Sequence, residues 1–296
     1  MAQALLIHNP SAARTRDRTV DAIRSVFTSA GWTIEAPGTK HPDDALEIAD
    51  QGVTAGVDVL AIYGGDGTVH NVAGRVGDKV PLGLIPGGTG NLLAGNLRLP
   101  RNPARAAKAI VEGTPRHIDL GRLTCNGDVK YFTVACGAGF DAEMMAGTSG
   151  PSKRRWGMGA YIATAWHVLG RHRTVDYQIT VDDEKYEFEA ASVLVANCRE
   201  IIPPFLRLRD GISFDDGVLD VVVLNANGLR ETITVLWQLF IRSVGDDKRV
   251  RHIPGRVVKV ESSVPRPVQL DGEAAGITPF IADVTPGGIR VMLPEG

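Results

Sequence analysis

The stretch VDVLAIYGGDGTVHNVAG, residues 57–74, contains the strongest local signal in the chain. Its first six residues, VDVLAI, are mostly apolar, as in a buried strand, and two glycines follow after Tyr63. One carboxylate, Asp66, then stands between glycines, ahead of a helical pattern that opens at Thr68. Glycine tolerates positive φ and lets another group come close to the backbone. The stretch therefore predicts a strand, a tight exit and a helix, with some group lying close to the exit.

Length and composition limit the class of protein. The 296 residues carry a net charge of −2, with 44% hydrophobic and 22% charged residues, which predicts a globular protein of two domains. A nucleic-acid binder would usually be basic, so no nucleic-acid partner is expected. The three cysteines show no metal-ligand spacing, which fits a reducing cytoplasm. The first residues do not form a signal-peptide pattern, and no run of about 18 apolar residues predicts a bilayer span.

The first part of the chain alternates short apolar runs with helical patterns, which is typical of a parallel sheet with crossover helices. In one helical pattern, Val20, Ile23 and Phe27 share a face. The expected strands are 4–8, 33–36, 57–63 and 82–85, and the expected helices are 18–30, 42–51 and 103–111. We predict an α/β domain here.

After Arg116, period-two patterns dominate and predict a mostly antiparallel β domain. The expected strands are 117–124, 130–136, 174–181, 186–197, 218–224, 256–261, 267–270 and 289–293. Asp182-Asp183 and Pro286–Gly288 are interpreted as turns. Helices are expected near 157–169 and 229–241.

Two strand exits are rich in glycine. We call Gly64–Thr68, GGDGT, the first glycine loop and Pro86–Asn91, PGGTGN, the second glycine loop. Ligands of open α/β sheets bind outside the carboxyl ends of the strands, where both loops are expected, and backbone amides at a helix start favour anions. The alternative is that these are ordinary turns, but two such loops together favour a cradle for a polyphosphate.

Other nucleotide motifs fit less well. No GxxxxGK[ST] P-loop occurs, and the lysine–glutamate and His-Arg-Asp elements of protein kinases are missing. GAGFDA at 137–142 satisfies G-x-G-x-x-A, but no acidic residue follows at the distance expected for a ribose contact. We interpret it as a bulge or tight turn.

Six ordered motifs resemble the diacylglycerol kinase catalytic family, which includes soluble bacterial lipid kinases and sphingosine kinases. Beside the two glycine loops they are Asn9-Pro10, Asp119-x-Gly121 paired with Gly137-x-Gly139-Phe-Asp141, Asp216-Gly217-x-Leu219-Asp220 and Asp271-Gly272-Glu273. The resemblance covers nearly the whole chain. NAD kinases also carry GGDGT, so that motif alone would be less specific.

The resemblance implies an α/β plus all-β fold of the NAD kinase/diacylglycerol kinase type. An N-terminal α/β nucleotide-binding domain, residues 1–122 with a returning tail at about 284–296, would be joined to a C-terminal β-sandwich lipid-substrate domain, residues 123–283. The site would lie in the cleft. The residues implied to bind ATP are Asn9, Pro10, Gly64, Gly65, Gly67, Thr68, Gly87, Gly88, Thr89 and Asn91.

The resemblance also implies two catalytic carboxylates and a metal site. Asp66 would act at the reacting phosphate through Mg²⁺, and Glu273 would lie near the acceptor hydroxyl; which of them is the base stays open. A structural Mg²⁺ would be held by the Asp216 carboxylate with the carbonyls of Ser213 and Val218, and oxygen ligands suit that ion. Many relatives have an aspartate where this chain has Leu92, so its loss places more weight on Asp66 and Glu273.

The acceptor is expected to be a lipid at a membrane surface. Lys153-Arg-Arg-Trp156 precedes an apolar helical pattern, which would suit peripheral contact with an anionic bilayer, although a helix packed on the β domain explains it equally well. We expect a cytoplasmic, ATP- and Mg²⁺-dependent lipid kinase, with contact on the inner face of the membrane and a homodimer as further expectations. Diacylglycerol is the first acceptor and sphingoid or other long-chain lipids the next. The rivals are an NAD-kinase-like enzyme and a non-catalytic nucleotide-binding regulator.

Overall fold

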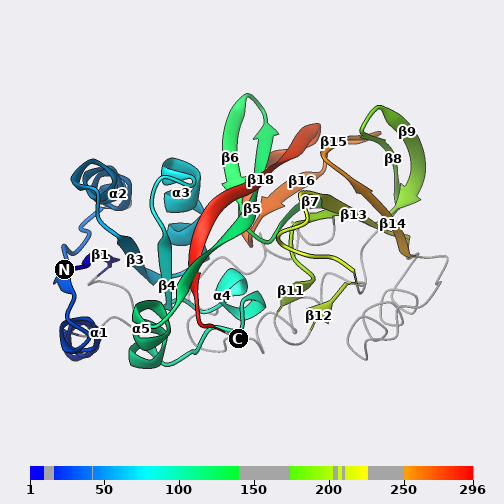
Figure 1. Cartoon of the computed structure of the whole chain (residues 1–296). Coiled ribbons are helices and arrows are strands. Elements are labelled where there is room, and N and C mark those ends of the chain that lie inside the picture. Colours follow the sequence, from blue (N-terminus) through cyan, green and yellow to red (C-terminus); the bar gives the residue numbers. More distant parts are fainter. Residues whose placement is uncertain are drawn as a thin grey trace. The chain divides into compact units, whose positions relative to one another are not determined.

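The computed structural model describes residues 1–9, 17–41, 43–139, 174–202, 206–208, 211–225 and 250–295. They form two compact units, Met1–Leu120 with Pro286–Gly296, and Gly121–Thr285. Figure 1 labels their helices and strands.

The first unit contains a parallel sheet. β1 (Gln3–His8) pairs with β2 (Thr33–Glu35) and with β3 (Val59–Gly64), which pairs with β4 (Leu82–Pro86). The last part of β18 (Phe280–Leu293) pairs in parallel with β4. The order within this unit is β2-β1-β3-β4-β18, so the final strand of the chain belongs to its first sheet.

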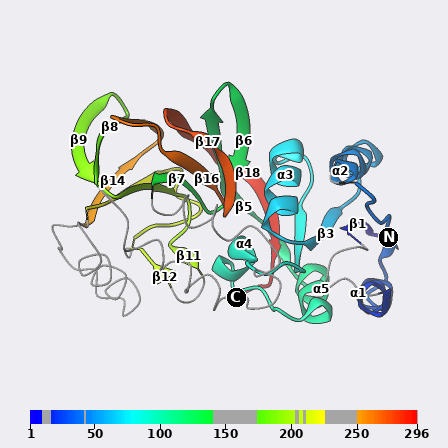
Figure 2. The ribbon, with the colours of Figure 1, turned by 180° about the vertical axis from the view of Figure 1, so that it is seen from behind.

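Helices cover both faces of this sheet, as the two opposite views show (Figure 1, Figure 2). α1 (Asp17–Ser29) and α5 (Pro103–Val111) pack together on one face, and α2 (Asp44–Ala55) and α3 (Asp66–Val76) on the other. The predicted face of α1 is buried, through Val20, Ile23 and Phe27. Each helix therefore turns its apolar stripe to the sheet and leaves the carboxyl ends of the strands to the loops. A short helix, α4 (Leu92–Asn96), follows the second glycine loop.

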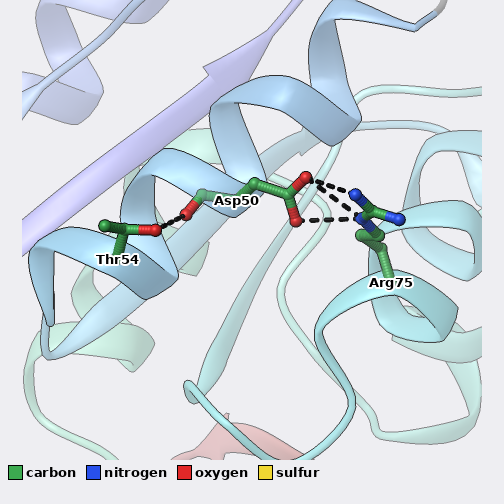
Figure 3. Close-up of polar contacts among 3 residues, drawn as sticks. All are labelled: Asp50, Thr54 and Arg75. Carbon is green, nitrogen blue, oxygen red and sulfur yellow. Dashed lines mark hydrogen bonds and ion pairs between the residues drawn. The ribbon is translucent and has the colours of Figure 1, made fainter.

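An ion pair joins α2 to α3 at the surface. Arg75 donates from Nε to Asp50 Oδ1 at 2.9 Å and from Nη2 to Oδ2 at 2.6 Å (Figure 3). The Thr54 hydroxyl donates to the Asp50 carbonyl oxygen in the same view. Both charged groups are solvent-exposed, so the pair contributes little to stability.

The second unit is a β-sandwich. One sheet has the order β14-β13-β10-β7-β16-β17, and every neighbouring pair in it is antiparallel. Its strands are Val250–Gly255, Leu219–Leu224, Ser192–Ala196, Ala135–Gly139, Pro267–Leu270 and Glu273–Ile277, in that spatial order. Opposite it lie β9 (Glu184–Ala190), β8 (Val175–Val181), β15 (Val257–Ser262) and the first part of β18. Tyr177, Val260 and Phe280 from this layer pack on Val193 and Val221 from the other.

Two further strand pairs, which include a strand that connects the units, complete the described part of the fold. β5 (Thr114–Cys125) runs from the first unit into the second, as β18 runs back. β5 forms a hairpin with β6 (Asp128–Phe132), and β11 (Glu200–Ile202) pairs with β12 (Leu206–Arg207). The α/β plus all-β fold class is confirmed.

Some local expectations are wrong. Pro286–Gly288 is no turn but lies inside β18, where Gly287, at φ 59°, donates its N–H to the buried carboxylate of Asp119 at 2.7 Å. Residues 137–139 of the segment interpreted as a bulge or turn lie in β7, which pairs with β10 in unbroken register, and residues 140–142 lie outside the described residues. A Cβ at Gly137 would lie 2.5 Å from the carbonyl oxygen of Val193. Close packing of two strands therefore explains this glycine.

Other differences concern element boundaries. The helix expected from Thr68 begins two residues earlier, at Asp66, and the helix expected from residue 42 begins at Asp44. The helices expected at 157–169 and 229–241 lie outside the described residues. Among the residues that are described, no helix is long and apolar enough to cross a membrane.

Candidate nucleotide and phosphoryl-transfer site

Three candidate segments leave neighbouring strands at the same edge of the parallel sheet. Asn9 follows β1, Gly65 follows β3 and Gly87 follows β4. His8 lies opposite Tyr63, and Gly64 opposite Pro86, so the three strands end side by side. The order β2-β1-β3 reverses direction between β1 and β3, and such a switch point is where open α/β sheets bind ligands. Asn9 and the first glycine loop flank this point.

The two glycine loops contact each other through their backbones. Gly87 donates its N–H to the carbonyl oxygen of Gly64 at 2.9 Å. A Cβ on Gly88 would lie 2.6 Å from the Cα of Gly65, and backbone cannot yield as a flexible side chain does. What lies so close to the first glycine loop is therefore the second one. The glycines therefore let the loops after β3 and β4 pack directly against each other.

Asn91 shapes the second glycine loop. It takes up the left-handed conformation, at φ 51°, which asparagine tolerates better than most residues. Its Oδ1 accepts from the N–H of Gly88 at 2.9 Å, and its Nδ2 donates to the Gly88 carbonyl oxygen at 2.8 Å. The side chain that was expected to contact ATP thus closes the loop on itself.

Asp66, in the first glycine loop, binds the end of the second loop. Its Oδ2 accepts from the N–H of Asn91 at 2.7 Å, and its Oδ1 from the N–H of Leu92 at 2.5 Å. The residue also begins α3, whose cap, Gly65, provides no side-chain acceptor. The first turn of α3, with Gly67 and Thr68, therefore presents backbone amides at the edge where Asp66 holds the second loop.

His8 and Thr39 were missed by sequence reasoning. His8 is buried at the end of β1, its Nε2 lies 3.3 Å from the carbonyl oxygen of Ala36, and its Nδ1 has no hydrogen-bond partner among the described residues. Burial lowers the pKa of His8, and the contact with Ala36 opposes that shift. Thr39 donates its N–H to the carbonyl oxygen of His8 at 2.9 Å, which brings the loop after β2 to the same edge. The sequence signal that could have pointed to His8 is its position directly before Asn9.

In the second unit, Glu273 opens β17, an edge strand, and is exposed. It follows a turn in which Asp271 and Gly272 have φ of 43° and 88°. Asp271 is 5% exposed and accepts hydrogen bonds from the amides of Thr133, Val134 and Ala135 and from the Thr133 hydroxyl. A buried carboxylate therefore fixes the turn that presents Glu273.

The expected structural metal residues share one loop before β13. Asp216 Oδ1 accepts from the N–H of Val218 at 3.1 Å, and the Ser213 hydroxyl donates to Asp215. The carboxylate and the main-chain carbonyls of this loop are oxygen donors, which suits Mg²⁺. The described residues contain no cluster of three or more His, Cys, Asp or Glu that could hold a metal.

Several expected residues are not brought into these arrangements. Thr89 is exposed and makes no hydrogen bond to another of the described residues. Pro10, the Phe140–Asp141 part of the fourth motif and the basic segment Lys153–Trp156 lie outside the described residues.

Two family models match consecutive parts of the chain. Residues 3–123 match the family described as diacylglycerol kinase catalytic domain, and residues 134–293 match the YegS C-terminal NAD kinase beta sandwich-like domain.

Similar proteins are found among curated sequences and solved structures. A diacylglycerol kinase of Bacillus subtilis (strain 168) is 28% identical, over 94% of this chain and 92% of that protein. A protein of Stenotrophomonas maltophilia (strain K279a), named "Probable lipid kinase YegS-like", is 28% identical over 99% and 96%. The crystal structure of a diacylglycerol kinase from Bacillus anthracis str. Sterne superposes with a TM-score of 0.79 at 25% identity, over 98% and 96%.

Proposed function

The chain belongs to the diacylglycerol kinase catalytic domain family and is a lipid kinase, and from this membership we propose that it transfers the γ-phosphate of ATP to diacylglycerol, forming phosphatidic acid. ATP is the phosphate donor that a kinase of this family implies.

The observation that carries the proposal is the joined pair of glycine loops. Both follow the carboxyl ends of adjacent strands, next to the switch point, and they hold backbone close to backbone. Phosphoryl transfer requires a protein mainly to position the reactants and to stabilise developing charge. Backbone amides from both loops and from the start of α3 can do this without a P-loop lysine. Asn9, Gly65, Thr68, Gly88 and Thr89 are the proposed nucleotide contacts.

The phosphate end of the site has one carboxylate, Asp66. Mg²⁺ is often held by one or two carboxylates together with the substrate phosphates. The single carboxylate of Asp66, beside backbone amide donors, is consistent with this type of coordination. When bound, the ion would neutralise part of the charge on the transferring phosphate. Leu92, which directly follows the second glycine loop, is apolar, and Asp66 is the only acidic group in the two loops.

Glu273 is the proposed general base. It would take the proton from the acceptor hydroxyl as the oxygen attacks phosphorus, while the bond between the γ-phosphorus and the bridging oxygen of ADP breaks. The buried Asp271 supports this assignment, because it holds the preceding turn in one conformation. The loop of Ser213, Asp216 and Val218 is the proposed structural Mg²⁺ site.

Other acceptors remain as second candidates. The similar proteins are named both diacylglycerol kinase and, more broadly, lipid kinase, and the broader name is compatible with sphingoid bases or other long-chain alcohols as alternatives.

The acceptor can be tested directly. Purified protein is incubated with labelled ATP, Mg²⁺ and either a total lipid extract, diacylglycerol in mixed micelles, or NAD. We expect labelled phosphatidic acid from diacylglycerol and no NADP. Label in another lipid would change the acceptor, and NADP without a lipid product would favour the NAD-kinase-like alternative. Binding of ATP with no turnover on any acceptor would favour a non-catalytic regulator.

A further inference from the structure

The carboxylate of Asp66 already binds two groups of the protein itself. Each of its oxygens accepts one backbone amide, from Asn91 and from Leu92, residues that lie 25 and 26 positions later in the chain. Hydrogen bonds to a charged acceptor are roughly twice as strong as neutral ones. The single negative charge of the two glycine loops is therefore used to hold them together.

The surrounding loop is built for this contact. The left-handed conformation of Asn91 and its two bonds to Gly88 direct consecutive amides at Asp66. Gly90 leaves room for the carboxylate, because a Cβ there would lie 2.6 Å from Asp66 Oδ2. We call this arrangement, the Asp66 carboxylate bound by the amides of Asn91 and Leu92 beside Gly90, the Asp66 clasp.

We propose that Asp66 is a positioning residue, whose charge assembles the two glycine loops into a nucleotide site before any metal ion binds. This proposal rests on the nucleotide-binding function proposed above. The clasp uses one acceptor position on each oxygen, and a carboxylate has about four, so it is compatible with an additional contact to Mg²⁺. Holding the two loops together is thus a role of Asp66 in addition to any contact with a metal ion.

The two roles predict opposite effects in the absence of metal. If Asp66 acts only through Mg²⁺, then without metal it repels the polyphosphate, and Asp66→Asn should bind metal-free ATP as well as the wild type or more tightly. If Asp66 positions the second glycine loop, Asp66→Asn should bind metal-free ATP more weakly. An asparagine has one oxygen and would turn its NH₂ group toward one of the two amides, so the loop loses at least one bond.

Two measurements test the proposal, each on the full chain. The first is amide hydrogen exchange at Asn91 and Leu92 without nucleotide, in wild type, Asp66→Asn and the control Asp50→Asn, which removes a surface carboxylate outside the loops. The second is metal-free ATP affinity, in EDTA, for the same proteins and for Gly90→Ala, which keeps the carboxylate but crowds it. A thermal melt shows whether each variant is folded.

We expect exchange at the two amides to be about ten-fold faster or more in Asp66→Asn, and unchanged in Asp50→Asn. Metal-free ATP should bind about ten-fold more weakly to Asp66→Asn and Gly90→Ala, and normally to Asp50→Asn. Unchanged exchange, or metal-free binding that is equal or tighter in Asp66→Asn, would overturn the proposal. If the wild type binds no ATP even with Mg²⁺ present, the proposed function fails, and exchange at Asn91 and Leu92 still decides whether the clasp exists.

Discussion

Replacing Asp271 with asparagine should cost the second unit a large part of its stability. The carboxylate is 5% exposed, and each of its oxygens accepts two hydrogen bonds: Oδ1 from the amides of Val134 and Ala135, Oδ2 from the amide and hydroxyl of Thr133. Asparagine keeps the size of the side chain but replaces one oxygen with an NH₂ group. Whichever way this amide turns, two buried donors face another donor and lose their acceptor.

The magnitude follows from that count. Leaving a buried donor unsatisfied costs about 1–3 kcal/mol, so two such donors predict a loss of about 2–6 kcal/mol. Domains are commonly stable by only about 5–15 kcal/mol, so Asp271→Asn should bring the second unit near the limit of folding. The turn that presents Glu273 should loosen at the same time, and kcat should fall more than ATP affinity.

Thr133→Val is the matched control. It removes only the hydroxyl donor and leaves three amides on the carboxylate, so a loss of about 1 kcal/mol is expected. Urea unfolding, with hydrogen exchange in β7 and β16 as a probe local to this unit, measures both variants. If Asp271→Asn unfolds at the same urea concentration as the wild type, or loses no more than Thr133→Val, the carboxylate does not organise this turn.

Three further results are expected. Glu273→Gln should lower kcat by about 10²–10⁴-fold with ATP affinity retained, and wild-type kcat in this variant would transfer the role of base to Asp66. Gly88→Ala should weaken ATP binding, because the added Cβ would lie 2.6 Å from the Cα of Gly65. An equilibrium binding measurement checks this, and normal ATP affinity in the variant would mean that the two loops can move apart freely. Burial lowers the pKa of His8 below its usual value of about 6.5. As the pH falls, the unfolded chain therefore binds a proton at His8 before the folded protein does. The folded state loses stability below about pH 6.5 for this reason. The Tm of the wild type should therefore drop more steeply between pH 7 and pH 5 than that of His8→Gln, and parallel curves would remove His8 as a cause.

The sequence predicted best the elements whose signal is local and strong. The spacing of Val20, Ile23 and Phe27 predicted the buried face of α1, because one helix and one sheet face decide it. The glycines at 64–65 and 87–88 correctly predicted a close approach to the backbone. They could not show that the approaching group is the other loop, because that contact joins residues more than 20 positions apart.

The sequence predicted less where distant residues override local preference. Pro286–Gly288 has the composition of a turn, yet it continues a strand, because the Asp119 carboxylate binds the N–H of Gly287 across 168 positions. β17 was missed, since its sequence, EAAGI, has little of the β-branched or aromatic character of strands. Asp66 was expected to face a metal, and its bonds to Asn91 and Leu92 appear only once the second loop is in place.

The course of β18 has a consequence for the synthesis of the enzyme. Ile289, Val291 and Met292, near the end of β18, are buried, and Val291 pairs with β4 of the first unit. The ribosome releases these residues only after it has made every strand of the second unit. A nascent chain thus holds the sequence of both glycine loops long before their sheet is complete. A product cut short by premature termination would lack this strand, so translation to the end of β18 is a condition for assembling the kinase.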